Sequence, residues 1–184
     1  LIPTLRKYAT NIDTLITEGT MLNRNDECIH ECKVSEKMAN VMKAFKYVFV
    51  LASATDIERL ASIKNASSEA NKTLYVCSNF MASTMKFFTE RESSLSRGLF
   101  NFSPRMLRLN GLDRIKKKGF VLIAGTSQIS RVKKLLKELP IEETLLIYSS
   151  WEGYYTIPEQ IAANPGYKNF RELFYNIVDI HTSG

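Results

Sequence analysis

The chain has 184 residues, which suits one domain, or one domain that carries a fragment of another. Hydrophobic residues make up 45% and charged residues 24%, which excludes a disordered chain, and no apolar run reaches the ~18 residues of a transmembrane helix. The net charge of +6 permits a polyanionic partner without requiring one, and three cysteines without a visible signal peptide predict reduced thiols and a cytoplasmic location.

Runs of β-branched and aromatic residues that break into small polar residues recur along the chain. A helix end over residues 1–10 and a strand over 12–17 come first, and a helix over 25–45 follows. Its apolar stripe consists of Val34, Met38, Val41, Met42 and Phe45. Further strands are predicted at 47–52, 73–77, 120–124, 144–148 and 176–180. Helical patterns separate these strands.

Residues 93–118 interrupt the alternation. They contain Gly98, Pro104 and Gly111 among short apolar runs without a sustained period. This pattern predicts an irregular or short-helical excursion, or a lid. Elsewhere, apolar strands that alternate with helices are typical of a parallel sheet covered on both faces. We therefore predict a Rossmann-like, three-layer α/β domain with a mostly parallel sheet.

Small polar residues follow the predicted strands at the edge of the sheet where ligands usually bind. Ser53 and Thr55 follow one strand, where either is expected to cap the next helix, and Gly125, Thr126 and Ser127 follow another. The second group resembles a phosphate-binding turn at a helix N-terminus, although a plain helix cap explains it equally well. It is neither a Walker motif nor GxGxxG.

Three charged or titratable side chains are candidates for the same edge. Glu18 ends the strand predicted at 12–17, and His181 follows the last strand. Arg59 lies one helical turn beyond Thr55, where its guanidinium could bind a phosphate, or instead form a salt bridge on the helix face. No nucleophilic triad can be drawn.

Two local patterns have competing interpretations. The run Cys28-Ile29-His30-Glu31-Cys32 suggests zinc, but on a helix His30 points away from the two cysteines, and the chain lacks a second pair of ligands. Trp151 stands at the end of a predicted strand, beside Tyr154 and Tyr155. These aromatics either stack on bases or fill an interface with a neighbouring domain, and we favour the interface.

Four runs together resemble a known family: TLITEGTMLNR, YVFVLASATDIERLASIKNAS, LLIYSSWEGYY and VDIHTSG. They are similar to the β-CASP group of metallo-β-lactamase-fold nucleases, the relatives of ribonuclease J. The resemblance covers most of the chain and is weakest at 93–118. It implies that 1–24 is the end of a metallo-β-lactamase domain, with the motif-A strand, and that 25–184 is a β-CASP domain.

The resemblance also implies roles for single residues. Glu18 matches the family's motif-A acid, which orients a histidine of the metal centre. Residues 181–184 match the start of the family's His-x-Ser-Gly-His run. The position of His181 at the same edge as Glu18 favours a functional role, and Ser183 is an expected substrate contact. The expected substrate contacts are thus Ser53, Thr55, Arg59, Thr126, Ser127 and Ser183.

The family's zinc ligands, a His-x-His-x-Asp-His run with a later His and Asp, have no counterpart in a chain with two histidines. We therefore expect no metal ligand or cofactor here, two zinc ions in a full-length parent, and no activity from this chain alone. The expected function is RNA recognition in a zinc-dependent ribonuclease. The expected partners are RNA and the parent metallo-β-lactamase domain, with no membrane, and a homo-oligomer is compatible. The alternatives are a Rossmann-like domain that binds a nucleotide or small phosphate ligand, and an interaction scaffold.

Overall fold

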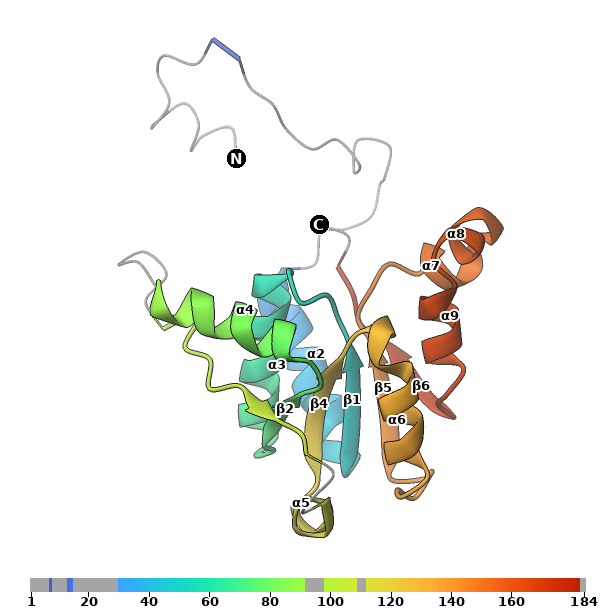
Figure 1. The fold of residues 1–184 in the computed structure, drawn as a ribbon. Coiled ribbons are helices and arrows are strands. Elements are labelled where there is room, and N and C mark those ends of the chain that lie inside the picture. The colour runs from blue at the N-terminus through green and yellow to red at the C-terminus, as the bar shows by residue number, and fades with distance from the viewer. Residues whose placement is uncertain (1–6, 8–12, 15–29, 92–97, 109–111, 183–184) are drawn as a thin grey trace.

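The computed structural model describes residues 7, 13–14, 30–91, 98–108 and 112–182 (Figure 1). Within these ranges, six strands form one sheet in the order β3-β2-β4-β1-β5-β6, and all five pairings are parallel. Helices cover both faces of the sheet. The prediction of a three-layer α/β domain with a parallel sheet is therefore confirmed.

The strands follow the apolar runs of the sequence. They are β1 Tyr47–Leu51, β2 Leu74–Val76, β3 Arg105–Met106, β4 Phe120–Ala124, β5 Thr144–Tyr148 and β6 Asn176–Asp179. Five of the predicted strands are confirmed to within one residue at each end. The strand predicted at 12–17 lies outside the described residues except for 13–14.

The helices occupy the segments between the strands. They are α2 Glu31–Ala44, α3 Ile57–Glu69, α4 Asn79–Glu90, α5 Leu112–Lys118, α6 Ile129–Leu136, α7 Gly153–Thr156, α8 Pro158–Ala163 and α9 Pro165–Arg171, with a 3₁₀ turn η1 at Thr126–Gln128. In the part of the chain that the structure describes, none is both long and apolar enough to span a membrane.

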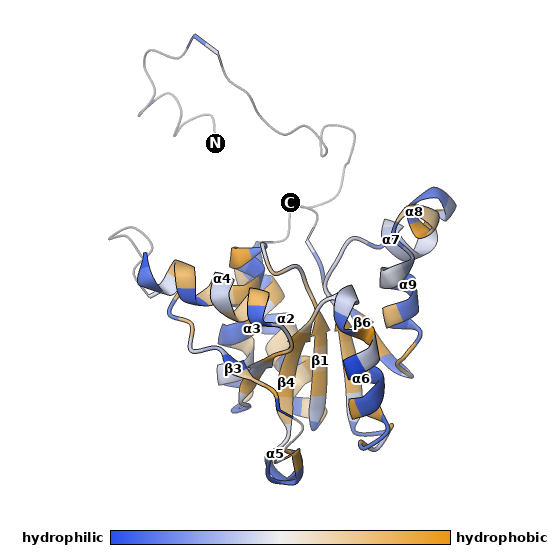
Figure 2. Cartoon of the chain, in the orientation of Figure 1, coloured by the Kyte–Doolittle hydropathy of each residue, from blue (hydrophilic) through white to orange (hydrophobic). Residues whose placement is uncertain are grey.

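Successive side chains along each strand point to opposite faces of the sheet, so the hydrophobic core has two parts, one on each face. In β1, Val48 and Val50 pack against α2, α3 and α4, whereas Phe49 and Leu51 pack against α6 and α9. Every residue of β1, β4 and β5 is buried. Figure 2 shows these strands as a hydrophobic layer between helices with hydrophilic outer faces. Each fully buried aliphatic side chain contributes about 1.5–3 kcal/mol of transfer free energy, so both faces must be covered.

The strand order creates a crevice beside β1. The chain leaves β1 through α3 toward β2, whereas it leaves β4 through α6 toward β5 on the other side of β1. Because α3 and α6 pack on opposite faces, the loops after β1 and β4 diverge at the carboxyl edge. Such a divergence is the usual place of a ligand site in an open parallel sheet.

Two local predictions are wrong. The lid interpretation of 93–118 fails for 98–108, because Phe102 and Leu107 are buried and β3 pairs with β2 at the sheet edge. The cap of α3 is neither Ser53 nor Thr55. Asp56 takes that role, since its carboxylate accepts a hydrogen bond from the Arg59 N–H at 3.1 Å.

We expect Gly119→Ala to lower the free energy of unfolding by about 1–3 kcal/mol. Gly119 has a φ of +72°, and a Cβ there would overlap the carbonyl oxygen of Lys46, which accepts the first hydrogen bond of β4. Gly98→Ala is the matched control, because Gly98 also has a positive φ, +85°, but a Cβ would meet no atom within 4 Å. Chemical denaturation of both variants measures the difference. Equal losses would show that backbone strain alone, and not the overlap, restricts position 119.

Candidate functional site

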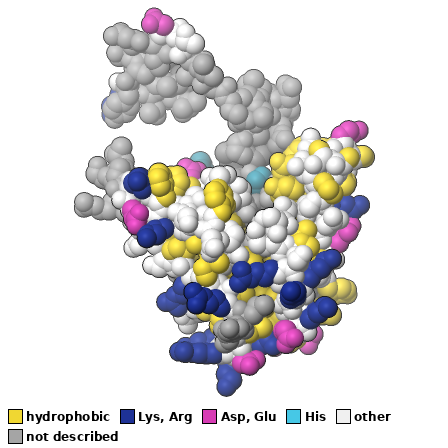
Figure 3. All heavy atoms as spheres, in the orientation of Figure 1, with side chains coloured by type: hydrophobic (Ala, Val, Ile, Leu, Met, Phe, Trp, Pro, Cys, Tyr) yellow, Lys and Arg dark blue, Asp and Glu magenta, His cyan; other side chains and the backbone are white. Residues whose placement is uncertain are grey.

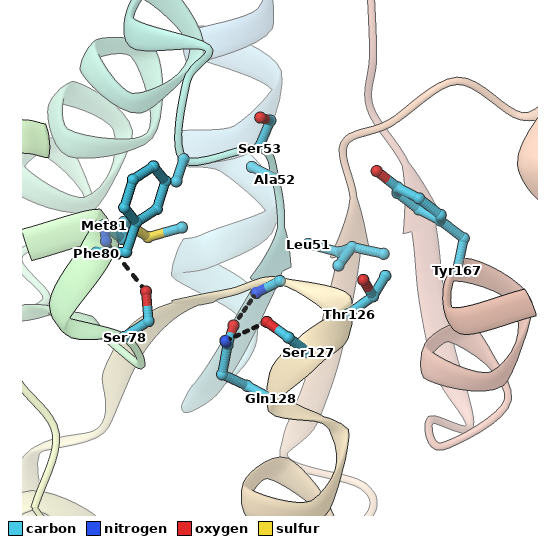
Figure 4. Close-up of a pocket in the computed structure, with 12 residues that line it drawn as sticks. Leu51, Ala52, Ser53, Ser78, Phe80, Met81, Thr126, Ser127, Gln128 and Tyr167 are labelled. Carbon is cyan, nitrogen blue, oxygen red and sulfur yellow. Dashed lines mark hydrogen bonds between the residues drawn. The ribbon is translucent and has the colours of Figure 1, made fainter. Parts of the chain in front are cut away.

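A pocket of about 260 Å³ lies at the carboxyl ends of β1, β2 and β4, in the crevice between the diverging loops (Figure 4). Its lining consists of Leu51, Ala52, Ser53, Ala54, Ser78, Phe80, Met81, Gly125, Thr126, Ser127, Gln128 and Tyr167. The polar groups come from loops that follow three different strands. The sheet thus brings together segments that are more than 70 residues apart in sequence.

The structure brings together three of the predicted substrate contacts. Ser53, Thr126 and Ser127 all line the pocket. Thr55 does not line it, but its Oγ1 lies 2.9 Å from the Oγ of Ser53, and its backbone N–H donates to the same Oγ at 3.2 Å. Thr55 therefore orients Ser53 within the loop after β1.

Side chains of the turn after β4 form hydrogen bonds within the turn itself. The Gly125 N–H donates to Oε1 of Gln128 at 2.8 Å, and the Gln128 amide donates to Oγ of Ser127. The glycine amide is thus occupied, and the turn differs from an open phosphate loop. The Ser127 oxygen acts as an acceptor in this contact, which leaves its O–H able to donate to a ligand.

Two aromatic side chains form opposite walls of the pocket, as Figure 4 shows. Phe80, from the first turn of α4, is 65% exposed. Tyr167, from α9, stacks on Tyr154 with ring centroids 4.2 Å apart and planes 14° apart. Burial, followed by the proximity of Tyr154, raises the pKa of Tyr167, so its hydroxyl stays protonated. Neither wall was among the predicted site residues, because the places of Phe80 and Tyr167 in the pocket are set by how α4 and α9 pack.

Arg59 does not reach this pocket, because its guanidinium is buried in a separate network. The side chain is 1% exposed. Its Nε and Nη2 donate to Glu31, with the shortest contact at 2.7 Å. Nη2 also donates to Thr182 Oγ1 at 2.9 Å.

The remaining guanidinium nitrogen, Nη1, contacts Ser149 and His181. It lies 2.6 Å from the Ser149 Oγ and 3.1 Å from Nδ1 of His181. A guanidinium has five N–H groups, and these contacts use all of them. Arg59 therefore has no donor left for a phosphate, although it does turn toward the carboxyl edge as the sequence suggested.

Glu31 is the anion that makes this burial tolerable. Its carboxylate accepts hydrogen bonds from Arg59, from Ser62 at 2.6 Å and from Thr182 at 3.3 Å. Burial opposes ionisation of Glu31, but the hydrogen bonds from Arg59 and Ser62 and the charge of Arg59 outweigh it, so its pKa lies below the ordinary value. Glu31 was not among the predicted site residues, because nothing in its spacing connects it to Arg59 28 residues later.

The network fixes the tautomer of His181. An arginine always donates, so Nδ1 accepts and the neutral ring carries its proton on Nε2. His181 and Thr182 are therefore held by one guanidinium at the end of β6. Glu18 and Ser183 lie outside the described residues, so their predicted roles stay predictions.

The aromatic group after β5 packs within the protein. Trp151 contacts Tyr154 edge-on, with ring centroids 5.5 Å apart, and Tyr148 donates its hydroxyl hydrogen to the Trp151 carbonyl at 3.3 Å. Tyr155 donates to the Asp179 carboxylate at 3.1 Å, and Arg171 bonds the same carboxylate at 3.0 Å. This cluster joins α7 and α9 to the end of β6.

The polar groups of the pocket are neutral. Among the described residues no Lys, Arg, His, Asp or Glu lines it, and its hydroxyl and amide groups can donate and accept hydrogen bonds. On the face shown in Figure 3, most Lys and Arg side chains lie in the lower half, around α5 and α6.

The chain matches no protein-family model and no curated protein.

We expect Glu31→Gln to lower the free energy of unfolding at pH 7 by about 3 kcal/mol, because it leaves the buried Arg59 charge without its counterion. Since the folded-state pKa of Glu31 is lowered, the stabilisation by ionised Glu31 is fully present above its ordinary pKa of 4.5 and is lost as the pH falls through the folded value. The difference between wild type and variant should therefore shrink below pH 4.5.

Urea titrations at pH 7 and at pH values below 4.5 measure this difference. Glu36→Gln is the control, because Glu36 is exposed on the same helix and forms no ion pair within the described ranges. A Glu31→Gln variant as stable at pH 7 as the Glu36→Gln control would contradict the assigned role.

Proposed function

We propose that this chain is the RNA-recognition domain of a metal-dependent ribonuclease of the metallo-β-lactamase fold, of the β-CASP type. The observation that best supports this proposal is the hydroxyl-lined pocket in the crevice of the sheet. It lies at the same edge as the Arg59 network that holds His181 and Thr182. The runs that carry the family resemblance include the loop after β1, which lines the pocket, and the loops after β5 and β6, which hold Ser149, His181 and Thr182.

In this proposal the pocket holds one nucleotide unit of the strand. The hydroxyls of Ser53, Thr126 and Ser127 donate to phosphate oxygens, and Phe80 and Tyr167 offer faces or edges to the base. Contacts of this kind are sequence-tolerant, because every base has a π-face and every nucleotide a phosphate. Arg59 contributes by positioning His181 and Thr182, since its own donors are occupied.

The two zinc ions that the resemblance implies are expected in a full-length parent. In the described ranges, no group of three or more His, Cys, Asp or Glu side chains could hold a metal ion. The proposal therefore gives this chain binding and positioning, and assigns the metal chemistry to the metallo-β-lactamase half of a longer parent.

A second candidate function is the binding of a free nucleotide or small phosphate ligand by the same pocket. Its volume of about 260 Å³ is small and is bounded by Phe80 and Tyr167, which favours a compact ligand over a long strand. The two candidates differ in the number of phosphates that Lys and Arg side chains outside the pocket would neutralise, and hence in salt dependence.

We expect the chain to bind a labelled single-stranded RNA with an affinity that falls steeply with salt. The salt dependence comes from phosphates of the strand that Lys and Arg side chains outside the neutral pocket would neutralise, at about 0.7 in log K for each such phosphate per decade of salt. A mononucleotide held by the hydroxyls alone should therefore bind weakly, with an affinity that changes little with salt. Fluorescence anisotropy from low to physiological salt measures both. Saturable binding of the mononucleotide together with salt-independent RNA binding would favour the second candidate and contradict the first.

The double variant Thr126→Val/Ser127→Ala locates the binding site, and should weaken RNA binding about tenfold or more because it removes two donors to a charged oxygen. The matched control is Ser83→Ala/Thr84→Val, which removes the same pair of hydroxyls from α4 outside the pocket. An equal effect of both doubles would place the RNA elsewhere.

We also expect this chain alone to leave RNA intact in the presence of zinc. Its described residues lack a metal cluster, and the pocket contains no carboxylate or imidazole that could act as a base. Gel analysis of labelled RNA with and without added metal checks this. Metal-dependent cleavage that follows the protein through purification would overturn the division of labour proposed here.

A further inference from the structure

A second concave site lies at the opposite edge of the sheet from the hydroxyl pocket. It has a volume of about 360 Å³ and is formed by the end of α3, the start of β2 and the segment that contains β3. Its lining consists of Lys64, Ser67, Ser68, Lys72, Thr73, Leu74, Met85, Asn101, Ser103 and Arg105. We call it the basic groove, because three of these residues are cationic and none is acidic.

One of the three cations, Lys72, stabilises the fold through hydrogen bonds to backbone carbonyls. Lys72 donates from Nζ to the carbonyl oxygens of Phe45 at 2.6 Å and Lys46 at 3.1 Å, which ties the start of β2 to the end of α2. The charge of Lys72 adds to the potential of the groove, but two of its three N–H groups are committed.

The other two cations, Lys64 and Arg105, form no comparable contact within the described residues. Neither Lys64 nor Arg105 forms an ion pair or a side-chain hydrogen bond with any residue in the described part of the chain. By contrast, several basic residues elsewhere pair with carboxylates: Lys43, Lys46, Lys86, Lys116, Lys168 and Arg171. Two cations without counterions in one concave site are the arrangement that an anion would complete.

The rest of the lining supplies neutral donors. The side chains of Thr73, Asn101 and Ser103 make no hydrogen bond to other described residues, so a hydroxyl or amide hydrogen of each is available. The hydroxyls of Ser67 and Ser68, in contrast, both donate to the Lys64 carbonyl, at 2.8 and 3.0 Å. The groove also lies at the C-terminal end of α3, where the helix dipole is negative, so its cationic side chains must outweigh that dipole to hold an anion.

Burial is the main cause that lowers the pKa of Lys72, and the charge of Lys46, outside the groove, is the second. A phosphate group in the groove would meet Lys64 and Arg105 as donors, and its negative charge would favour the charged form of the partly buried Lys72.

We propose that the basic groove binds phosphate groups, supplied either by the backbone of a nucleic acid strand or by a free oligophosphate. The proposal does not rest on the proposed function, because no residue of the groove lines the hydroxyl pocket. It places a second anion site at the amino ends of β2 and β3.

The test compares two double variants with equal loss of charge. Lys64→Gln/Arg105→Gln removes the two uncommitted cations of the groove, whereas Lys133→Gln/Lys134→Gln removes two exposed lysines of α6. Lys72 is left unchanged, because its contacts to Phe45 and Lys46 make its loss a folding defect. Thermal unfolding of both variants confirms that each is folded.

The probes are tripolyphosphate, followed by calorimetry, and a labelled single-stranded RNA, followed by anisotropy at several salt concentrations. The groove variant should bind at least one probe about tenfold or more weakly than the α6 variant does. For RNA, the plot of log K against log salt should also become less steep: the magnitude of its slope should decrease by about 1.4, which is about 0.7 for each lost cation.

Each outcome decides the proposal. A loss confined to RNA identifies a nucleic acid strand as the source of the phosphate, and a loss with tripolyphosphate identifies a free oligophosphate. If neither probe binds, or if both double variants behave alike, the proposal is overturned. RNA binding that depends on Thr126 and Ser127 but not on Lys64 and Arg105 would overturn the groove and leave the proposed function intact.

Discussion

The carboxyl edge of this domain depends on the ion pair and the hydrogen bonds of the buried Arg59 guanidinium, which hold the ends of several segments together. Moving a charge out of water costs several kcal/mol, and the chain offsets this with Glu31, Ser149, His181 and Thr182. These partners come from the start of α2 and from the ends of β5 and β6. One side chain of α3 therefore fixes the relative positions of three segments, and the geometry beside the pocket follows from a single ion pair and its hydrogen bonds.

The sequence predicted what depends on local pattern and missed what depends on long-range contact. The runs that became β1, β4 and β5 are apolar throughout because the sheet is covered on both faces, and their limits could be read to within a residue. The strand β3 has only two residues, Arg105 and Met106, and exists because β2 lies beside it. Two residues are too few to show the alternating pattern of a strand, so the segment that contains β3 was predicted as an irregular excursion.

The candidate site divides in the same way. Ser53, Thr126 and Ser127 could be predicted to meet, because parallel strands end at one edge and their following loops converge there. Phe80 and Tyr167 could not, since their place in the pocket is set by how α4 and α9 pack. Arg59 shows the limit most clearly. Its direction was predictable from helical spacing, and a salt bridge was one of its two predicted roles, but its burial and its partner were not predictable, because Glu31 belongs to another helix.

The two edges of the sheet have a consequence for association between copies. On one side, β3 is only two residues long and Pro104, which precedes it, has no N–H to donate. On the other, β6 has four residues and ends at the exposed Asp179, whose carboxylate pairs with Arg171. Short edges that carry charged side chains are poor templates for a further strand. The described domain is thus protected against lateral growth of its sheet into aggregates, even though its central strands are among the most apolar segments of the chain.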